Sequence, residues 1–598
     1  MTGRAIPARV VSLAWAVLVA VMPGVAAARL FDGPDLPDGI GRAVRFAVAS
    51  ALLVGFVAFL WMRRRKRWDA LSAWNRRALP LLTAPVLVLL ADTDLVSTRG
   101  GLALGSIAAF ALTVASSRLA GPVPAPMRRR RATPWVILAA ALLVGGWLSS
   151  IAWVRHDSMQ TNTYDLGLFV NAIWNTSQGR WFVCTLVPTG SILDEHVSLM
   201  LVVFAALMKM GLTAKGLLAL QAMWLCAGAV PAYLLARRHL GEAGGVVFAA
   251  AYLLHPSVHA NALWDFHPLS FTPPLVLWMF VWGRTRRLRP AFLLCVLALL
   301  MLREDMAFVL LAYAATLWLD GRARRAALVG GIAIAFLVGL NLAMGQTTSH
   351  VSRYADLAAR GGGGLTGLVV SSLFDPSFVL SHALSYGKVV YVGMQGVGVL
   401  LLPALARRRW PLLGVTVAFS VLATSKHVSN PYFHYTSLLL PIVFGLAPAG
   451  ASALLVWTRG FGPIATRRRA LVHGVFAGSL ALSFAYGGLH DNESFRAGFR
   501  TPRRTLSEAA GERVAWLRGA LEGIPDGTSM AVTGRVGPHV AQRPAVYAFP
   551  PERPVELMIV FRGDLRRDQR TWLQEQVASG AWSIVESTGS LSIYRRNP

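Results

Sequence analysis

The residues that could do chemistry in this chain gather in five short polar segments, each of which lies between long apolar runs. The segments are YDLG at 164–167, DEH at 194–196, DFHP at 265–268, RED at 303–305 and HVSNPYFHY at 427–435. They offer carboxylates, an arginine and imidazoles, which are the groups used in proton transfer and phosphate binding. Ionisable residues at membrane depth are costly and usually mark a site or a pathway. We therefore expect the five segments to meet at one site.

Asp165 is the candidate general base of that site. A carboxylate can take a proton from a hydroxyl group, and partial burial raises its pKa toward the working pH. The alternative is structural, because Asp165 could cap a helix that starts at Leu166. The spacing of residues leaves both interpretations open.

Phosphate binding is the chemistry expected of the RED segment and of two histidines. The planar fork of Arg303 can give a phosphate two hydrogen bonds at once, unless Arg303, Glu304 and Asp305 form a turn whose charges pair with one another. His267 and His434 could donate to phosphate or move a proton, or they could be structural hydrogen-bonding groups. Trp264 and Tyr435 also suit an interfacial aromatic belt. The candidate substrate-binding residues are Arg303, His267, His434, Tyr435, Glu304, Asp194 and His196.

A metal site is a weaker expectation. Asp194, Glu195 and His196 are possible ligands, but neither an HExxH nor a DxD pattern accompanies them. A divalent cation would most plausibly be held at Asp165 or Asp194, with water completing a shell of oxygen ligands. No metal ligand and no cofactor are therefore assigned. The three cysteines, at 184, 226 and 295, are too scattered for a zinc site or a disulfide framework.

The elements that must position these residues are membrane helices. The chain has 598 residues, of which 55% are hydrophobic and only 15% charged, whereas a soluble protein carries about a quarter charged residues. Its net charge of +29 is concentrated in short clusters such as RRRKR at 63–67 and RTRRLR at 284–289. Such clusters between apolar runs are typical of cytoplasmic loops and argue against nucleic-acid binding.

The apolar runs predict an all-α polytopic protein of the plasma or inner membrane with about 15 transmembrane helices. With the N-terminus in the cytoplasm, every basic cluster falls on the cytoplasmic side, provided that 197–210 is re-entrant or surface-lying rather than a full crossing. The predicted spans are 11–28, 42–62, 78–92, 101–118, 134–154, 216–236, 245–262, 271–283, 290–302, 306–319, 326–344, 388–406, 411–425, 436–457 and 470–488.

Three regions follow from this topology. Residues 1–130 are expected to form N-terminal helices outside the core, and 131–490 the membrane core, with outer loops at 155–196 and 345–387. Residues 491–598 change in composition and predict a small extracytoplasmic α/β domain. Its expected strands are SMAVTG, AVYAF, ELMIVF and a final hairpin of WSIVES and LSIYRR. Its expected helices lie within RRTLSEAAGERVAWLRGAL and DLRRDQRTWLQEQVASG.

Several motifs in order resemble a known family. YDLGLFVNAIWNTSQGR, DEHVSLML, LLALQAMWLCAGAVPAYLLARR, NALWDFHPLSFTPP, LREDMA, FHYTSLLLP and VTGRVGPHVAQRPAVYAFP look like domain-of-unknown-function family 2079, over roughly residues 135–598. That family in turn resembles the GT-C membrane glycosyltransferases, which use polyprenyl-phosphate sugars at the outer membrane face. The resemblance implies that 134–154 is the first core helix and that Asp165 opens the outer loop. GT-C families often have paired acidic residues at this point, whereas Asp165 stands alone.

The resemblance therefore implies an enzyme that moves a sugar from a polyprenyl-phosphate donor to an envelope acceptor, with membrane lipids as its other partners. A transporter or flippase of a lipid-linked envelope component is the first alternative; it would place charges near the bilayer midplane and show internal repeats. A non-catalytic scaffold is the second, and it would leave the converging polar residues unexplained. The sequence does not identify the sugar, the acceptor, the isoprenoid length or the oligomeric state.

Overall fold

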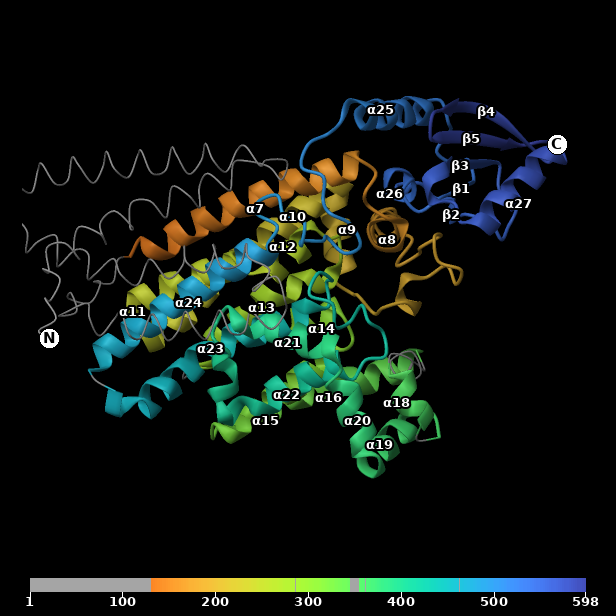
Figure 1. The fold of residues 1–598 in the computed structure, drawn as a ribbon. Coiled ribbons are helices and arrows are strands. Elements are labelled where there is room, and N and C mark those ends of the chain that lie inside the picture. Colours follow the sequence, from red (N-terminus) through yellow and green to blue (C-terminus); the bar gives the residue numbers. More distant parts are fainter. Residues whose placement is uncertain (1–130, 286, 345–353, 361, 462) are drawn as a thin grey trace, which may run out of the picture.

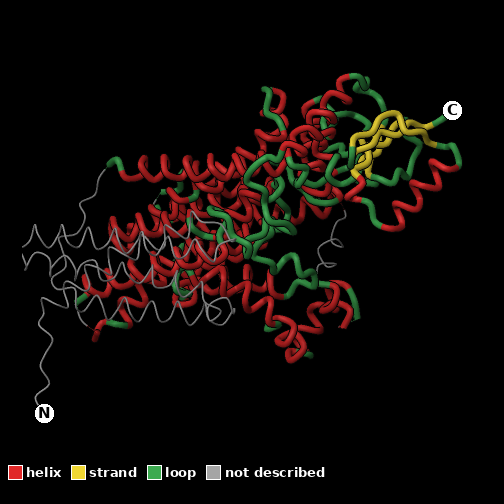
Figure 2. The backbone as a smooth tube through the Cα atoms, turned by 45° about the horizontal axis from the view of Figure 1, so that its top comes forward, coloured by secondary structure: helices red, strands yellow, loops and turns green. Residues whose placement is uncertain are grey.

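The computed structural model describes residues 131–285, 287–344, 354–360, 362–461 and 463–598 (Figure 1). The predicted spans within 1–130, and residues 345–353 of the predicted outer loop, lie outside the described residues. The described chain is mostly helical, with one small sheet near its C-terminus (Figure 2).

Most of the predicted spans in the described residues coincide with helices. The bundle helices are α7 (Thr133–Asp157), α10 (Ala214–Ala227), α11 (Ala229–Leu253), α12 (Pro256–Leu263), α13 (Thr272–Gly283), α14 (Pro290–Leu302), α15 (Met306–Leu319), α16 (Ala323–Met344), α21 (Tyr386–Val397), α22 (Trp410–Val421), α23 (Thr436–Trp457) and α24 (Ile464–Tyr486). By length and composition, four stretches could cross a membrane: Thr133–Asp157, Ala214–Leu253, Ala323–Ala343 and Thr436–Trp457. The total of about 15 crossings stays a prediction.

The stretch Ala214–Leu253 is not one straight helix. Gly241 has a φ of 77°, which side-chain-bearing residues rarely adopt. Two contacts show that the chain folds back beyond Gly241. The Tyr233 hydroxyl donates to Glu242 Oε1 at 2.8 Å, and the Tyr233 ring packs against Gly245. In a straight helix Tyr233 and Gly245 would be about 18 Å apart. The reversal separates the predicted spans 216–236 and 245–262.

Helix α9 (Leu201–Lys209) agrees with the prediction that 197–210 does not cross the membrane. Its nine residues rise about 14 Å, roughly half of the hydrocarbon thickness. Leu201 and Phe204 are buried beside α8 (Leu168–Ser177). The helix is thus part of the packed core.

Three short helices connect the two ends of the bundle. Helices α13, α14 and α15 have 12, 13 and 14 residues, and prolines near the first positions of α13 and α14 suit a helix start because their fixed φ is already helical. Two polar segments, DFHP at 265–268 and RED at 303–305, precede α13 and α15 respectively. The opposite ends of these helices lie about 18–21 Å away.

The C-terminal region forms a five-stranded mixed sheet in the order β2-β1-β3-β5-β4. Strands β1 (Met530–Val532), β2 (Val546–Ala548) and β3 (Leu557–Phe561) are parallel, and β4 (Trp582–Thr588) and β5 (Leu591–Arg596) form the predicted hairpin. Helices α25 (Glu508–Glu522) and α27 (Arg567–Ala578) are also as predicted, and α26 (Gly537–Val540) is short. Figure 1 shows this unit at the same end of the bundle as α8 and as α18 (Ala355–Arg360), α19 (Gly364–Phe374) and α20 (Pro376–Ala383).

Hydrogen bonds fasten the sheet unit to the bundle. The backbone N–H of Thr163 and its hydroxyl donate to the Gly534 carbonyl at 2.7 and 2.8 Å. The Asn171 amide on α8 donates to the Ala541 carbonyl at 2.9 Å, and the Thr185 hydroxyl donates to the Val546 carbonyl at 2.6 Å. These bonds fix the edge of the sheet directly over the YDLG segment.

This arrangement predicts which residues share a side of the membrane. Single cysteines at the exposed positions Thr189 and Glu522 should react with a membrane-impermeant maleimide on intact cells, whereas cysteines at the exposed positions Arg324 and Arg408 should react only after lysis. The three native cysteines are buried, so background labelling should be low. Labelling of positions 189 and 324 from the same side would contradict the topology.

Candidate active site

A cavity of about 880 Å³ lies between the bundle and the C-terminal sheet. Its bundle side includes Asn162, Asp165, Phe169, Glu195, His196, His267, His434 and Tyr435. Its sheet side includes Thr533, Gly534, Tyr547, Phe549, Arg553, Asp564, Arg566 and Trp572, and Arg500 joins it from the connecting segment. Four of the five predicted polar segments therefore contribute residues to one cavity.

Asp165 lies in a π-helical turn, Thr163–Gly167, at the start of α8. Such turns are rare and are often found at functional sites. The N-cap of the turn is Asn162, whose side-chain oxygen accepts the Tyr164 N–H at 3.2 Å. Asp165 Oδ2 instead accepts a hydrogen bond from Trp264 Nε1 at 3.1 Å. The capping alternative for Asp165 is therefore wrong, and Trp264 is more than an interfacial aromatic.

The surroundings of Asp165 favour its protonated form. Burial raises the pKa of Asp165 to about 7, the negative charge of Asp265 adds to the rise, and the hydrogen bond from Trp264 opposes it. A carboxyl group with such a pKa exchanges its proton near neutral pH, which is the property required of a general base.

Asp265 holds the backbone that leads into this turn. Its Oδ1 lies 3.3 Å from the Arg155 guanidinium of α7, and its Oδ2 accepts the Asn162 N–H at 2.7 Å. Arg155 also donates to the Leu263 carbonyl. Both charged side chains are buried. The ion pair thus ties α7, the end of α12 and the N-cap residue of the π turn together.

The two histidines lie beside Asp165. The rings of His267 and His434 stack at 3.9 Å with an interplanar angle of 13°, and His434 lies 4.2 Å from the Tyr435 ring. One ligand atom from each of Asp165, His267 and His434 lies within 4.8 Å of the others. A carboxylate and two imidazoles can form part of a zinc or other divalent-metal site.

The hydrogen bonding of His267 does not fit that metal site. Its Nδ1 accepts the Leu269 N–H at 3.1 Å, so the neutral ring carries its proton on Nε2. Neither nitrogen then has a lone pair left for a cation, and Nε2 is a donor suited to an anionic or hydroxyl oxygen. We therefore assign His267 as a hydrogen-bonding group and derive no step through a metal.

The RED and DEH segments meet behind the cavity. His196 Nδ1 lies 3.2 Å from Glu304 Oε1, and Glu304 Oε2 accepts the Val197 N–H at 3.0 Å. The Ser198 hydroxyl donates to the Leu302 carbonyl at 2.8 Å. Glu304 therefore fixes the 196–198 backbone and places His196 on the cavity wall.

Three predicted residues do not line the cavity: Glu304, which lies behind His196, and also Arg303 and Asp194. Arg303 is fully buried, its Nε donates to Asp305 Oδ2 at 2.8 Å, and its guanidinium lies 5.5 Å from the centre of the Tyr435 ring. Arg303 therefore packs against Tyr435 on the side away from the cavity. Its ion pair with Asp305 fits the alternative in which the charges of the RED segment pair with one another. Asp194 is exposed and does not line the cavity, whereas Glu195 and His196 do.

The cations that do line the cavity come from the last hundred residues. They are Arg500, Arg553 and Arg566, and sequence reasoning missed all three. Each parallel strand is followed by lining residues: Thr533 and Gly534 after β1, 549–553 after β2, and 563–566 after β3. Ligands commonly bind at the carboxyl ends of parallel strands. The signal was present in the TG, FPPER and RGDLR sequences at the ends of the predicted strands.

A helical membrane bundle with a polar cavity under a small mixed-sheet unit is the class of protein that this fold and site define. A family profile described as "Predicted membrane protein (DUF2079)" matches residues 155–592. The chain belongs to this family, as its motifs suggested, and it is an integral membrane protein.

Among solved structures, the chain is similar to ArnT from Cupriavidus metallidurans, whose crystal structure contains bound undecaprenyl phosphate. The two chains are 12% identical, the TM-score is 0.45, and the match covers 77% of this chain and 98% of ArnT. No curated protein matches the chain. The function is therefore argued from the geometry of the site itself.

The ion pair under the cavity predicts a stability effect. Asp265→Asn leaves the buried Arg155 without a counter-charge, and breaking a buried pair in this way costs about 3–5 kcal/mol. We expect a clear fall in unfolding temperature in detergent, measured by intrinsic fluorescence. Asp491→Asn is the control, because Asp491 is 81% exposed and lies 3.8 Å from Arg504, a geometry worth at most about 1 kcal/mol. Equal effects of the two variants would contradict the structural role of Asp265.

Proposed function

We propose that the protein is a GT-C-type membrane glycosyltransferase that moves a sugar from a polyprenyl-phosphate donor to a hydroxyl of an envelope acceptor. The observation that carries the proposal is Asp165, a carboxyl group with a pKa near neutrality, at the bundle side of a cavity that three arginines also line, two of them on the opposite, sheet side. A proton acceptor facing a cationic wall suits a reaction that deprotonates one oxygen and releases a phosphate.

The reaction balances with groups of this chain. Asp165 takes the acceptor hydroxyl proton, the acceptor oxygen bonds to the anomeric carbon, and the bond from that carbon to the phosphate oxygen breaks. The departing polyprenyl phosphate keeps the electron pair. Arg500, Arg553 and Arg566 would stabilise its negative charge, and Nε2 of His267 can donate to a sugar or phosphate oxygen.

The shape of the cavity also suits a lipid-linked donor. Leu168, Phe169, Leu186, Val187 and Ile192 form an apolar stretch of its wall. Such a surface can hold the first isoprene units, since burying apolar area is favourable by about 25 cal/mol per Å². The polar wall across from it is left for the sugar phosphate.

The two alternatives explain less of this arrangement. A transporter should place its ionisable residues at mid-membrane, whereas Asp165, His267 and His434 lie at the end of the bundle that carries the sheet. A scaffold needs neither the raised pKa of Asp165 nor a cavity of this size. Incubating the purified protein with a panel of polyprenyl-phosphate sugars, and measuring sugar transfer or release, tests the proposal directly. Transport of a lipid-linked substrate without any transfer would favour the first alternative.

Asp165→Asn should give a folded but nearly inactive protein. Asparagine keeps the shape and can still accept the Trp264 hydrogen bond, but it cannot take a proton. Loss of a general base costs about 10²–10⁴-fold in rate, so turnover on the best substrate of the panel should fall by that factor with little change in unfolding temperature. Full turnover by this variant would rule out Asp165 as the base. Activity that is abolished by EDTA would instead indicate a cation at the histidines.

The pH profile should report Asp165. Because the carboxylate is the active form, the rate should rise with pH through about 7 and level off above it. Trp264→Phe removes the hydrogen bond that lowers this pKa, so the rising limb should move to higher pH. Trp572→Phe alters another tryptophan of the cavity wall and should leave the limb in place. An unchanged limb in Trp264→Phe would mean that the profile reports a different group.

A further inference from the structure

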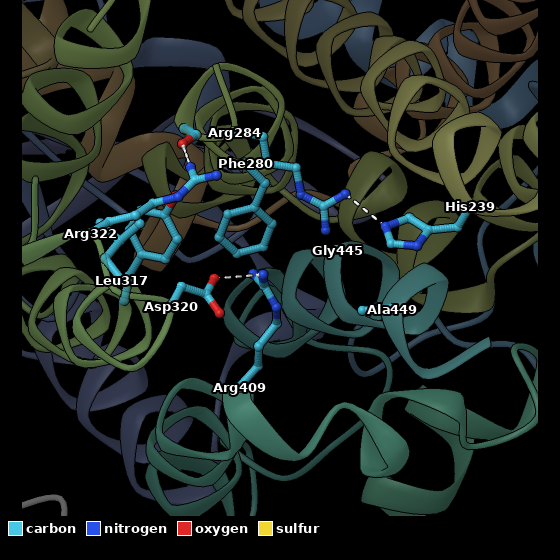
Figure 3. Close-up of a pocket in the computed structure, with 11 residues that line it drawn as sticks. His239, Phe280, Arg284, Leu317, Asp320, Arg322, Arg409, Gly445 and Ala449 are labelled. Carbon is cyan, nitrogen blue, oxygen red and sulfur yellow. Dashed lines mark hydrogen bonds and ion pairs between the residues drawn. The ribbon is translucent and has the colours of Figure 1, made fainter. Parts of the chain in front are cut away.

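A second polar cavity, of about 230 Å³, lies at the ends of α13 and α15 opposite to the active site. Figure 3 shows Arg284, Arg322 and Arg409 reaching into it, together with Asp320 and His239. Its apolar wall includes Phe280, Leu317 and Ala449. Gly283 and Gly445 leave room for two side chains of its wall, because a Cβ would collide with Tyr313 at Gly283 and with Phe280 at Gly445. Nothing in the proposed transferase reaction uses this cavity.

Positive charge is in excess there. Arg409 Nη2 donates to Asp320 Oδ2 at 2.8 Å, and among the residues that line the cavity Asp320 is the one carboxylate. Arg284 donates to His239 Nε2 at 2.9 Å, while His239 Nδ1 lies 2.7 Å from the Ser452 hydroxyl. A histidine that accepts from an arginine is neutral. Arg284 and Arg322 are thus left without a carboxylate partner among the lining residues.

The protein itself does not relieve this excess. Arg284 lies in the turn after α13, where burial and the charges of Arg409 and Arg238 lower the pKa of its guanidinium to about 10. Arg322 donates to the Gly283 carbonyl, and Arg325 Nη1 donates to the same carbonyl at 2.7 Å. Each guanidinium has five donor N–H groups, so most of these donors can still bind a ligand.

We propose that this cavity binds a phosphoryl anion, carried either by an anionic lipid headgroup or by a free phosphate. Three guanidinium groups around one small space match the geometry of phosphate oxygens, which arginine binds through two parallel hydrogen bonds. The excess charge excludes a metal cation as the ligand. Basic pockets between membrane helices are known to take phosphate headgroups. The three arginines of this cavity belong to the basic clusters at 284–289, 322–325 and 407–409.

Arg322→Gln tests the proposal with little risk to the fold, because Arg325 still donates to the Gly283 carbonyl. Arg324→Gln is the matched control: it makes the same change of charge two residues away, on an exposed side chain. The full-length protein, purified in detergent and stripped of lipid, is titrated with inorganic phosphate and, separately, with dioleoylphosphatidylglycerol or dioleoylphosphatidylcholine. Unfolding temperature and native mass spectrometry report binding, so the test does not depend on any transferase activity.

We expect one of the two phosphate probes to bind and to stabilise the wild-type protein and Arg324→Gln. In Arg322→Gln the affinity should fall about 10–100-fold, the cost of one charge-assisted hydrogen bond. Binding of phosphatidylglycerol but not of inorganic phosphate assigns a lipid headgroup, and the reverse assigns free phosphate. If neither probe binds, if phosphatidylcholine binds equally well, or if the two variants behave alike, the proposal is overturned.

Discussion

The site depends on one buried carboxylate, Asp265. It neutralises Arg155 at the end of α7 and holds the backbone of Asn162, from which the π turn begins. The residue before it, Trp264, donates to Asp165, and His267 two residues later stacks on His434. A four-residue segment therefore positions the candidate base, its hydrogen-bond donor and the histidine pair. Because a buried charge must be paired, none of these partners can move independently, and the geometry is fixed before any substrate arrives.

The cavity lies between a helical bundle and a sheet, which contribute side chains of different charge. The bundle contributes Asp165 and the histidines, at the ends of apolar helices. The sheet contributes arginines on connections that follow parallel strands, where side chains converge without needing burial. Bonds through Thr163, Asn171 and Thr185 clamp the two layers together. An apolar region and a cationic region can thus line the same cavity without either compromising the fold.

Much of the fold could be predicted from the sequence because apolar run length and prolines fix helix bounds: α14, α15 and α23 begin and end where predicted. The convergence of the polar segments also followed from charge placement. The sequence could not reveal which side chain of a segment faces inward. Arg303 was expected at a phosphate, yet Asp305 pairs with it and Tyr435 separates it from the cavity. Asp194 and His196 were both predicted, yet His196 lines the cavity together with Glu195 and Asp194 does not. Long-range docking determined the rest, including the place of the arginines beyond residue 490 in the cavity wall.

The place of β5 in the sheet has a consequence for how the protein matures. Strand β5 follows β4 in the chain but lies between β3 and β4 in the sheet, so β3 gains its second neighbour only after both of these later strands have been synthesised. Until then β3 has one neighbouring strand fewer to hold the loops that carry Arg553 and Arg566 in place, although the bundle can already be inserted into the membrane. A newly made bundle would hold its carboxylate and histidines without the cationic wall. The sheet side of the cavity would therefore be completed after membrane insertion, and a chain cut before β4 would keep the bundle side of the cavity without a settled sheet side.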